Sequence, residues 1–404
     1  MQVVHSRFNA LLSACVLSLV VTAGWSQSLT WLGTLGGSES LASGVSADGS
    51  VVVGWAYNAF GQWRAFRWEN GVMQALGTLG GSYSVANGVS ADGAVVVGVS
   101  LNAGGAWRAF RWTASGGMQE LEGSYWNHHA KGVSADGSVV VGEGHRAGPL
   151  HAFRWTASGG IQNLGTLPGA NESSARAVSA DGRVVVGYAR YAAGQERAFR
   201  WENGVMQNLG TLPSGGNSRA NAVSANGAVV VGVAGNAAGQ LRAVRWTASG
   251  GIQDLGTLGG DLVWASAVSA DGSVVVGYDY AGQYRAVRWT ASGIEDLNTT
   301  YASLLTNGSR LELATAISPD GRYIVGQGYN VATGRNEAFL LDTRCTAHNG
   351  DVDRNGCVDD ADLLAVLFAF GQRGSYLGRV DVNCDGVVND ADLLTVLFNF
   401  RSGC

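Results

Sequence analysis

One phrase occurs seven times along this chain and takes up most of its length. It joins a Leu-Gly-Thr-Leu segment, the pattern Ala-x-Gly-Val-Ser-Ala-Asp-Gly-x-Val-Val-Val-Gly and an Arg-Ala-Phe-Arg-Trp segment. A fixed period of this kind means that one supersecondary unit is repeated, so repeated residues build the scaffold and function is sought where the copies differ. The turn inside the phrase begins at serines spaced 44 to 49 residues apart: Ser46, Ser90, Ser134, Ser179, Ser224, Ser269 and Ser318.

Each copy contains four short runs of β-branched and aromatic residues, divided by Gly, Asn, Asp and Ser. In the second copy the runs cover residues 86–90, 95–98, 108–112 and 118–121. Such runs are typical of strands, and an Ala-Asp-Gly sequence between two of them is typical of a hairpin turn. No segment between residues 27 and 344 shows a helical period, so we expect this part to be all-β.

Four antiparallel strands of this length form one blade of a β-propeller, and a solenoid is the competing architecture. The last copy ends after its third strand, at Leu341, while the missing fourth phrase stands before the first copy, at residues 29–35. If residues 29–35 pair beside residues 337–341, the ring closes and no long strand edge stays unpaired. We therefore predict a seven-bladed β-propeller over residues 27–344, with four-stranded blades closed by the N-terminal strand.

A tryptophan ends the third run in six of the copies. Identical positions in successive blades are what core packing requires, and a ligand platform is the alternative. These residues are Trp68, Trp112, Trp155, Trp201, Trp246 and Trp289.

Two resemblances rest on these residues. The strand–turn–strand pattern around Ser318-Pro319-Asp320-Gly321 resembles the TolB-type propellers, and the whole phrase, including His151-Ala152-Phe153, resembles the HAF repeat family of predicted extracellular bacterial proteins. The resemblance covers residues 29–341. It implies a propeller outside the cytoplasm and brings no catalytic residues.

Residues 1–26 have the pattern of a secretory signal peptide, with Arg7, an apolar run over residues 10–21 and small residues before position 26. Cys15 lies inside the apolar run rather than after it, so soluble secretion is favoured over a lipoprotein anchor. No later stretch is long and apolar enough to span a membrane. We expect a secreted protein that is extracellular or associated with the cell surface.

The acidic balance of the chain comes from its tail. Residues 345–404 hold nine Asp, four Arg and no Glu or Lys, which accounts for the whole formal net charge of −5. The repeat region is therefore neutral and lacks a basic stripe, which argues against nucleic acid as a partner.

The four cysteines that remain after signal cleavage all lie in residues 345–404. An even number of cysteines in a small secreted module is typical of disulfides, and four cysteines allow three pairings. We favour Cys345–Cys404, which joins the ends of the module, and Cys357–Cys384, which joins its two loops.

Two loops of twelve residues, 351–362 and 381–392, carry oxygen side chains in an EF-hand-like spacing with Gly356 and Gly386 at position 6. Ca²⁺ takes six to eight oxygen ligands around such a loop, with a backbone carbonyl at position 7. An acidic surface loop is the alternative, but it does not explain why the glycine recurs. We predict two Ca²⁺ ions bound by Asp351, Asp353, Asn355, Cys357, Asp359 and Asp362, and by Asp381, Asn383, Asp385, Val387, Asn389 and Asp392.

An apolar run follows each loop, at residues 363–370 and 393–400, and is expected to be a helix that begins on the position-12 carboxylate. Two loop–helix units without a leading helix resemble a type I dockerin over residues 349–400. The resemblance implies docking to a cohesin through loop positions 10 and 11 and the middle of each helix. Those places hold Asp360-Ala361 and Leu367-Phe368, then Asp390-Ala391 and Leu397-Phe398, where cellulosomal dockerins often carry Ser-Thr and basic residues.

The third copy departs most from the others and holds four of the six histidines. His128 and His129 lie at the start of its first strand, Glu143 and His145 at the end of its second, and His151 at the start of its third. These places share one edge of an antiparallel sheet, so we predict that the five side chains gather at one rim as a site for Zn²⁺ or an anionic ligand. Sequence drift with solvated histidines is the alternative.

We interpret the chain as a secreted, non-enzymatic binding or structural propeller, displayed through a calcium-dependent dockerin-like module. One alternative is an extracellular protein that binds or degrades polysaccharide, and another is a protein-interaction hub that uses the propeller faces. Glycoside hydrolysis needs two placed carboxylates, but most acids of the repeats are turn residues, and Asn226 replaces one of them. The expected partners are a cohesin-like protein for the tail and a glycan or protein for the propeller, and we expect a monomer.

Overall fold

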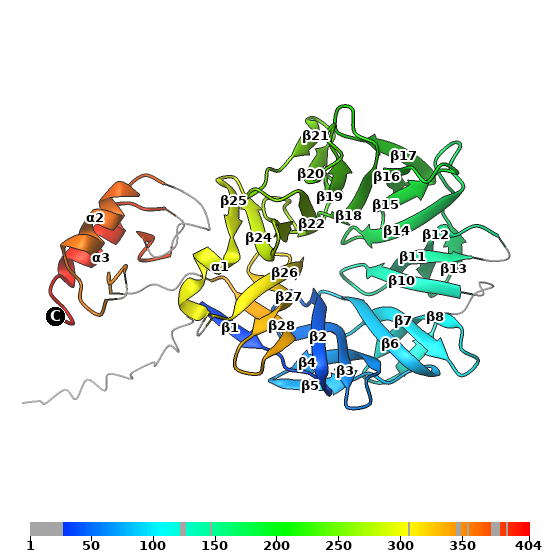
Figure 1. Cartoon of the computed structure of the whole chain (residues 1–404), viewed down its shortest axis with the longest axis horizontal. Helices are drawn as coiled ribbons and strands as arrows, with labels where there is room; N and C mark the ends of the chain where they lie inside the picture. The colour runs from blue at the N-terminus through cyan, green and yellow to red at the C-terminus, as the bar shows by residue number, and fades with distance from the viewer. Residues whose placement is uncertain are drawn as a thin grey trace, which may run out of the picture. The chain divides into compact units, whose positions relative to one another are not determined.

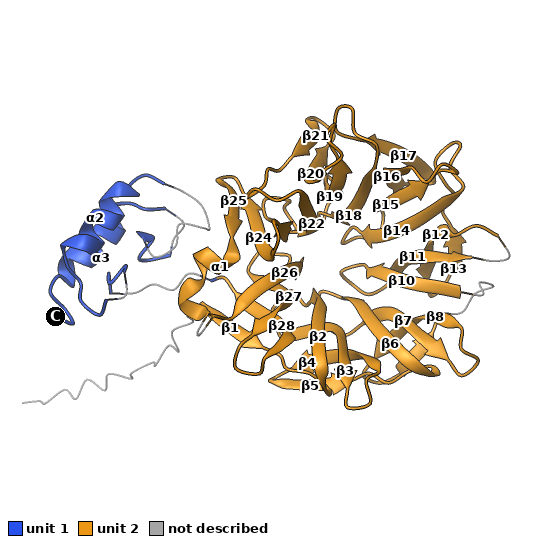
Figure 2. Cartoon of the chain, viewed as in Figure 1, with its two compact units in different colours: residues 1–26, 344–404 blue, residues 27–343 orange. Residues whose placement is uncertain are grey.

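The computed structural model describes residues 27–121, 127–145, 148–305, 308–344, 349–353, 355–372, 380–384 and 387–404. The larger compact unit is Gln27–Thr343, and the smaller one contains Arg344–Cys404 (Figure 2). The predicted signal peptide lies outside the described residues. Among those residues, no helix is both long and apolar enough to cross a membrane.

The larger unit is built from strands, four to each repeat. The first two repeats contain β2 (Gly36–Val45), β3 (Val51–Asn58), β4 (Trp63–Glu69) and β5 (Val72–Ala75), then β6 (Gly80–Val89), β7 (Val96–Asn102), β8 (Trp107–Thr113) and β9 (Gly117–Glu120). Repeats three and four contain β10 (Asn127–Val133), β11 (Val139–His145), β12 (His151–Thr156) and β13 (Gly160–Asn163), then β14 (Glu172–Val178), β15 (Val185–Arg190), β16 (Glu196–Glu202) and β17 (Val205–Gly210). Repeats five and six contain β18 (Ser218–Val223), β19 (Val229–Gly235), β20 (Leu241–Thr247) and β21 (Gly251–Asp254), then β22 (Leu262–Val268), β23 (Val275–Tyr280), β24 (Tyr284–Thr290) and β25 (Gly293–Asp296). Repeat seven contains β26 (Arg310–Ile317), β27 (Tyr323–Asn330) and β28 (Arg335–Asp342), and β1 (Ser28–Trp31) is its fourth strand.

Consecutive strands within a repeat pair antiparallel, so each repeat is one four-stranded ladder. Figure 1 shows the repeats arranged around a common centre, with the first strand of each repeat innermost. We predicted that this part is all-β, and the structure shows that it is mostly β.

The Ser-Ala-Asp-Gly turn between the first two strands links each repeat to the next. In repeat three, the Ser134 hydroxyl donates to Asp136 Oδ1 at 2.6 Å and accepts from the Val139 N–H at 2.9 Å. The Ala135 N–H then donates to the carbonyl of Ala180 in repeat four at 3.1 Å. Equivalent backbone bonds join each pair of consecutive repeats. The first runs from the Ala47 N–H to the Ala91 carbonyl, and the last runs from the Ala270 N–H to the Pro319 carbonyl.

Glycine is required in this turn for two reasons, as Gly137 shows. Its φ of +71° is one that residues with a Cβ rarely adopt. A Cβ at Gly137 would also lie 2.5 Å from Val95 Cγ2 in the preceding repeat. The turn is therefore a packing contact between repeats as well as a reversal of the chain.

The tryptophans at the end of the third strand belong to the core. Trp201, Trp246 and Trp289 are buried, and each packs in a cluster that joins two neighbouring repeats. The prediction of core packing at these positions is confirmed.

The first and last repeats are neighbours. β1 pairs antiparallel with β28, with Trp31 opposite Phe339, and the Leu32 N–H donates to the Ala338 carbonyl at 2.9 Å. The predicted pairing of the N-terminal segment beside residues 337–341 is thus confirmed for residues 28–32. In addition, the Thr315 hydroxyl donates to the Ala42 carbonyl at 2.6 Å.

One expectation was wrong, because the larger unit contains helical turns. α1 (Leu297–Thr300) and a 3₁₀ turn (Ala302–Leu304) lie between repeats six and seven, where the repeat period is longest. Asp296 caps α1 by accepting from the Asn298 N–H at 2.8 Å. The segment is too short to show a helical period in the sequence.

The smaller unit contains two helices, α2 (Asp360–Phe368) and α3 (Asp390–Phe398). Both begin two residues before the position-12 carboxylate, because Asp359 and Asn389 are the N-caps and the position-12 residues stand at the third helical position. Val358, Val366, Val388 and Val396 form the core of this unit, and all are fully buried.

Removal of β1 should destabilise the larger unit, because β1 covers the edge of β28 and its Trp31 ring packs against Phe339 with 6.4 Å between ring centroids. We expect deletion of residues 27–32 to lower the melting temperature by at least about 5 °C, since the deletion uncovers core residues worth several kcal/mol. Trp31→Ala should account for much of this loss, and Ser28→Ala, at an exposed position, should leave melting unchanged. A deletion variant that melts like the parent would show that β1 is not part of the cooperative unit.

Candidate functional sites

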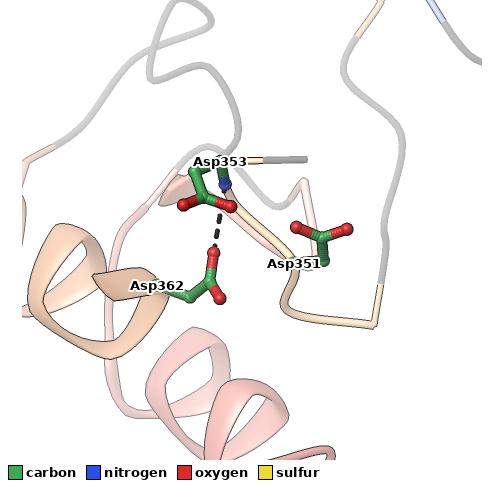
Figure 3. Close-up of side chains that lie close together, drawn as sticks. All are labelled: Asp351, Asp353 and Asp362. Carbon is green, nitrogen blue, oxygen red and sulfur yellow. Dashed lines mark hydrogen bonds between the residues drawn. The ribbon is translucent and has the colours of Figure 1, made fainter. Parts of the chain in front are cut away.

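Three carboxylates of the first predicted calcium loop lie together (Figure 3). Asp351, Asp353 and Asp362 each place an oxygen within 4.8 Å of the other two. Of the residues that the structure describes, these are the ones that form such a group of three or more potential metal ligands. Convergent carboxylates of this kind are a ligand set for a hard cation.

Asp362 connects the loop to the helix that follows it. The side chain is fully buried, and its Oδ1 accepts from the N–H groups of Val352 and Asp353 at 2.6 and 3.0 Å. Its Oδ2 accepts from the Asp359 N–H at 2.9 Å, and Asp359 in turn caps α2 through the Ala361 N–H at 2.8 Å. One carboxylate therefore closes the loop and completes a capping box at the start of the helix.

The middle of the first loop is held by side chains that bond its own backbone. The Gly356 N–H donates to Asp351 Oδ2 at 3.2 Å, and the Cys357 N–H donates to Asn355 Oδ1 at 2.7 Å. Gly356 has a φ of +90°, which explains the glycine at position 6.

The second loop repeats this geometry where it is described. Asp392 is fully buried and accepts from the N–H groups of Asn383 and Asn389 at 3.0 and 2.9 Å. Asn389 caps α3 through the Ala391 N–H at 2.7 Å, and Asp381 is 4% exposed. Asp385 and Gly386 lie outside the described residues, so the full second ligand set stays a prediction.

Both predicted disulfide pairings are wrong, because Cys357 is bonded to Cys404. The C-terminal turn lies beside the end of the first loop: the Arg401 N–H donates to the Val358 carbonyl at 2.7 Å, and the Val358 N–H donates to the Ser402 carbonyl at 3.0 Å. This backbone pairing brings the two cysteines together, with 4.7 Å between their Cα atoms. Cys384 is also disulfide-bonded, and its partner lies outside the described residues, as does Cys345.

The five residues of the predicted rim in repeat three do not gather as one set. Strand register places His129 opposite Glu143 and Asn127 opposite His145, so His129, Glu143 and His145 share one face of the sheet. Side chains alternate between faces along a strand, so His128 lies on the other face, as does His151, which stands opposite Gly144. The geometry gives the Zn²⁺ prediction no support.

His128 and His151 instead take over contacts that other repeats make with different residues. His128 stands where Ser84 and Ser173 bridge to the preceding repeat, and its Nε2 bonds the Leu121 carbonyl at 3.1 Å. His151 Nδ1 lies 2.9 Å from Asn163 Nδ2, where Arg108 pairs with Glu120 in repeat two. Sequence drift within a structural role explains both histidines.

Glu143 is the centre of the residues that do meet. Its Oε1 lies 3.6 Å from His129 Nδ1 and 3.5 Å from the Nζ of Lys131, the only lysine of the chain. Burial on its own raises the pKa of Glu143, but the bond from His129 and the charges of Lys131 and Arg176 outweigh it and lower the pKa to about 2. Sequence reasoning missed Lys131 and Arg176, although a lone lysine in a repeat array was a signal.

The chain matches no family model and no curated protein. Its fold is similar to that of an oligogalacturonate lyase from Vibrio parahaemolyticus, with a TM-score of 0.52 and 8% identity over 79% of this chain and 96% of that one. An oligogalacturonate lyase in complex with manganese gives a TM-score of 0.50 and 11% identity over 79% and 95%. TolB from Acinetobacter baumannii gives a TM-score of 0.43 and 13% identity over 77% of this chain and 64% of that chain, which is less than two thirds of its length.

The larger unit is a β-propeller. Identities this low show the fold alone, and they carry no residue, metal or activity to this chain. Because no family model matches, the resemblances to the HAF repeat and to the dockerin stay predictions.

The buried His128 should make the propeller sensitive to acid. Burial lowers its pKa from 6.5 to about 4, so the folded state resists protonation while the unfolded state takes up the proton. The contribution of this neutral histidine is complete above pH 6.5, and up to about 3 kcal/mol is lost as the pH falls from 6.5 to 4.

In the matched variant His128→Ser, repeat three carries the serine that repeat two has at the equivalent position. We expect urea unfolding at pH 7 and pH 4.5 to show a smaller loss of stability for this variant than for the parent, since other acid-sensitive groups are unchanged. Equal losses in the two proteins would contradict the assignment.

Proposed function

We propose that this chain is a secreted, non-enzymatic binding or structural protein in which a seven-bladed propeller is displayed through a dockerin-like, calcium-dependent docking module. The observation that carries the proposal is the convergence of Asp351, Asp353 and Asp362 in a loop whose capping geometry recurs at Asp392. A loop–helix unit that occurs twice at this spacing is suited to binding cations and to exposing its helices to a partner. The signal-peptide pattern and a disulfide in the same chain agree with secretion.

The count of seven blades and the closure of the ring are supported by contacts between repeats seven and one. Glu39 of β2 stands opposite Asn336 of β28 in a parallel bridge, and Gln327 Nε2 donates to the Ser40 carbonyl at 3.0 Å. The Ala338 N–H donates to the Ser40 hydroxyl at 2.8 Å, as the Ala65 N–H donates to Ser84 between repeats one and two. Repeats seven and one are therefore joined by the same kind of hydrogen bond as repeats one and two.

The donor set of the first loop fits Ca²⁺. Asp351, Asp353, Asn355, Asp359 and Asp362 would supply side-chain oxygens, and Cys357 would supply its carbonyl. A bound Ca²⁺ would neutralise the mutual repulsion of these carboxylates, so that binding of the ion and folding of the module are linked. Asp381, Asn383, Asp385, Val387, Asn389 and Asp392 would hold the second ion.

The helices of the module offer a matching pair of apolar surfaces. Phe368 of α2 is 84% exposed and Phe398 of α3 is 83% exposed, with Leu367 and Leu397 exposed beside them. Exposed apolar side chains at equivalent places on two helices are typical of a protein-binding surface. We propose that they bind a cohesin-like partner.

A polysaccharide-binding role for the propeller is the second candidate. Trp55, Tyr57, Trp63 and Tyr83 form a connected aromatic cluster where repeats one and two adjoin, with Trp63 39% exposed. Aromatic side chains with a few placed polar groups are typical of ligand sites. A degrading enzyme is the less favoured reading, because turn acids such as Asp92 and Asp136 bond the serine of their own turn and thereby have a lowered pKa.

Two kinds of variant separate calcium binding from docking. Asp362→Ala should remove one of two Ca²⁺ ions in calorimetry and abolish Ca²⁺-dependent capture by an array of purified cohesin domains. Asp360→Ala, at an exposed position outside the ligand set, should keep both ions. Phe368→Ala combined with Phe398→Ala should keep both ions and lose capture. No uptake of Ca²⁺ by the parent would refute the proposal, and capture that survives the double substitution would refute the docking surface.

A further inference from the structure

Each innermost strand of the propeller contains a β-bulge at the same place in its repeat. Strand register skips one residue between two small residues, as at Ala86 and Gly88 in repeat two. A bulge residue is left out of the ladder, so its side chain is free to serve another purpose. The seven bulge residues are Ser43, Asn87, Lys131, Arg176, Asn221, Ser266 and Thr315.

Polar bulge residues link one repeat to the next. Asn87 donates to the Ala130 carbonyl at 2.7 Å, and Asn221 donates to the Ala265 carbonyl at 2.9 Å. Ser43 makes the equivalent bond to the Ala86 carbonyl, and Thr315 makes it to the Ala42 carbonyl, both at 2.6 Å. A short polar residue at this position is therefore explained by the scaffold.

Lys131 and Arg176 occupy two adjoining bulges and depart from this pattern. Lys131 is half-buried, and its ammonium lies 3.5 Å from Glu143 Oε1. Arg176 makes no ion pair with any carboxylate in the part of the chain that the structure describes, and its Nε is buried without a hydrogen-bond partner there. The scaffold does not explain why long cations replace a hydrogen-bonding asparagine at both places.

Two further arginines lie against the same aromatic ring as Arg176. Its guanidinium lies 5.3 Å from the centre of the Tyr188 ring, and those of Arg219 and Arg190 lie 5.2 and 5.8 Å from the same ring. Arg190 pairs with both Glu172 and Glu196, and Arg219 pairs with Glu196. Lys131 is paired with Glu143, so four cations adjoin three carboxylates, and Arg176 is the one that forms no ion pair within the described residues.

The surroundings of these cations are partly open and partly aromatic. The side chains of Lys131 and Arg219 are 23% and 35% exposed. The Trp107 ring stands edge-on to His129, which contacts Glu143. Cations, a carboxylate acceptor and aromatic rings thus adjoin across repeats two to five.

We propose that Arg176, with Lys131 beside it, binds the carboxylate of an acidic oligosaccharide, a uronate, at the innermost strands of repeats three and four. This proposal rests on the binding role proposed for the propeller and names its ligand class. A guanidinium binds a carboxylate through two parallel N–H bonds, which explains an arginine without a protein carboxylate. Glu143 and the Trp107 and Tyr188 rings would contact the hydroxyl groups and the apolar faces of the sugar.

The repeats themselves supply variants that should fold. Lys131→Asn and Arg176→Asn each introduce the asparagine that repeats two and five have at the bulge. The melting temperature of both variants should therefore equal or exceed that of the parent. Ser266→Asn, at the bulge of repeat six, is the matched control. We expect calorimetry to show that the parent binds trigalacturonate and not neutral galactotriose. Arg176→Asn should lower the affinity at least about tenfold, and Ser266→Asn should not change it.

Several results would overturn the inference. Trigalacturonate binding that survives Arg176→Asn would remove Arg176 from the site. Binding of inorganic phosphate as tight as that of trigalacturonate would show a general anion site. Binding of galactotriose without trigalacturonate would leave the proposed binding function standing and refute this ligand class, whereas no binding of any glycan on an array would refute the polysaccharide role as a whole.

Discussion

The propeller depends on one hydrogen bond that recurs from repeat one to repeat seven, from the second residue of a turn to the same residue of the next repeat. The bond from the Ala91 N–H to the Ala135 carbonyl is 2.9 Å long, and its equivalents are 2.8 to 3.1 Å long. The serine and aspartate of each turn hold the donor in place, and the glycine allows the next repeat to approach. A change in any of these residues would disturb two repeats at once, which explains why they recur in nearly every copy.

Repeats seven and one are held together by other contacts, because that bond is absent between them. Pro319 has no N–H to donate, so the backbone link stops there. Tyr323 replaces the usual valine and packs under Gly49, where a Cβ would lie 2.6 Å from its ring. Gln327 supplies a side-chain bond to repeat one. Residues that differ from the repeat therefore have two explanations: some, like these, complete the scaffold, and others, like Arg176, have no scaffold role that the structure reveals.

The sequence predicted the features that depend on the repeat period and on local spacing. It did not predict which face of a strand a side chain occupies, or which distant segments come into contact. The strands, their turns and the pairing of residues 28–32 with β28 follow from period and chain topology. His128 was misassigned because proximity in sequence does not say which face a side chain occupies, and the structure places it on the buried face. The disulfide between Cys357 and Cys404 depends on backbone bonds of the C-terminal turn that leave no mark in the spacing of cysteines. The convergence of Asp351, Asp353 and Asp362 was predictable because all three belong to one short loop.

We propose that the repeats form one closed, cooperative ring. Hydrogen exchange of the amides that bond between turns, those of Ala47, Ala91, Ala135, Ala180, Ala225 and Ala270, tests it most directly. A closed ring has no terminal repeat, so these amides should exchange with similar free energies near that of global unfolding. An open array would fray from its ends. Protection that falls steadily from repeat four toward repeats one and six would contradict the account.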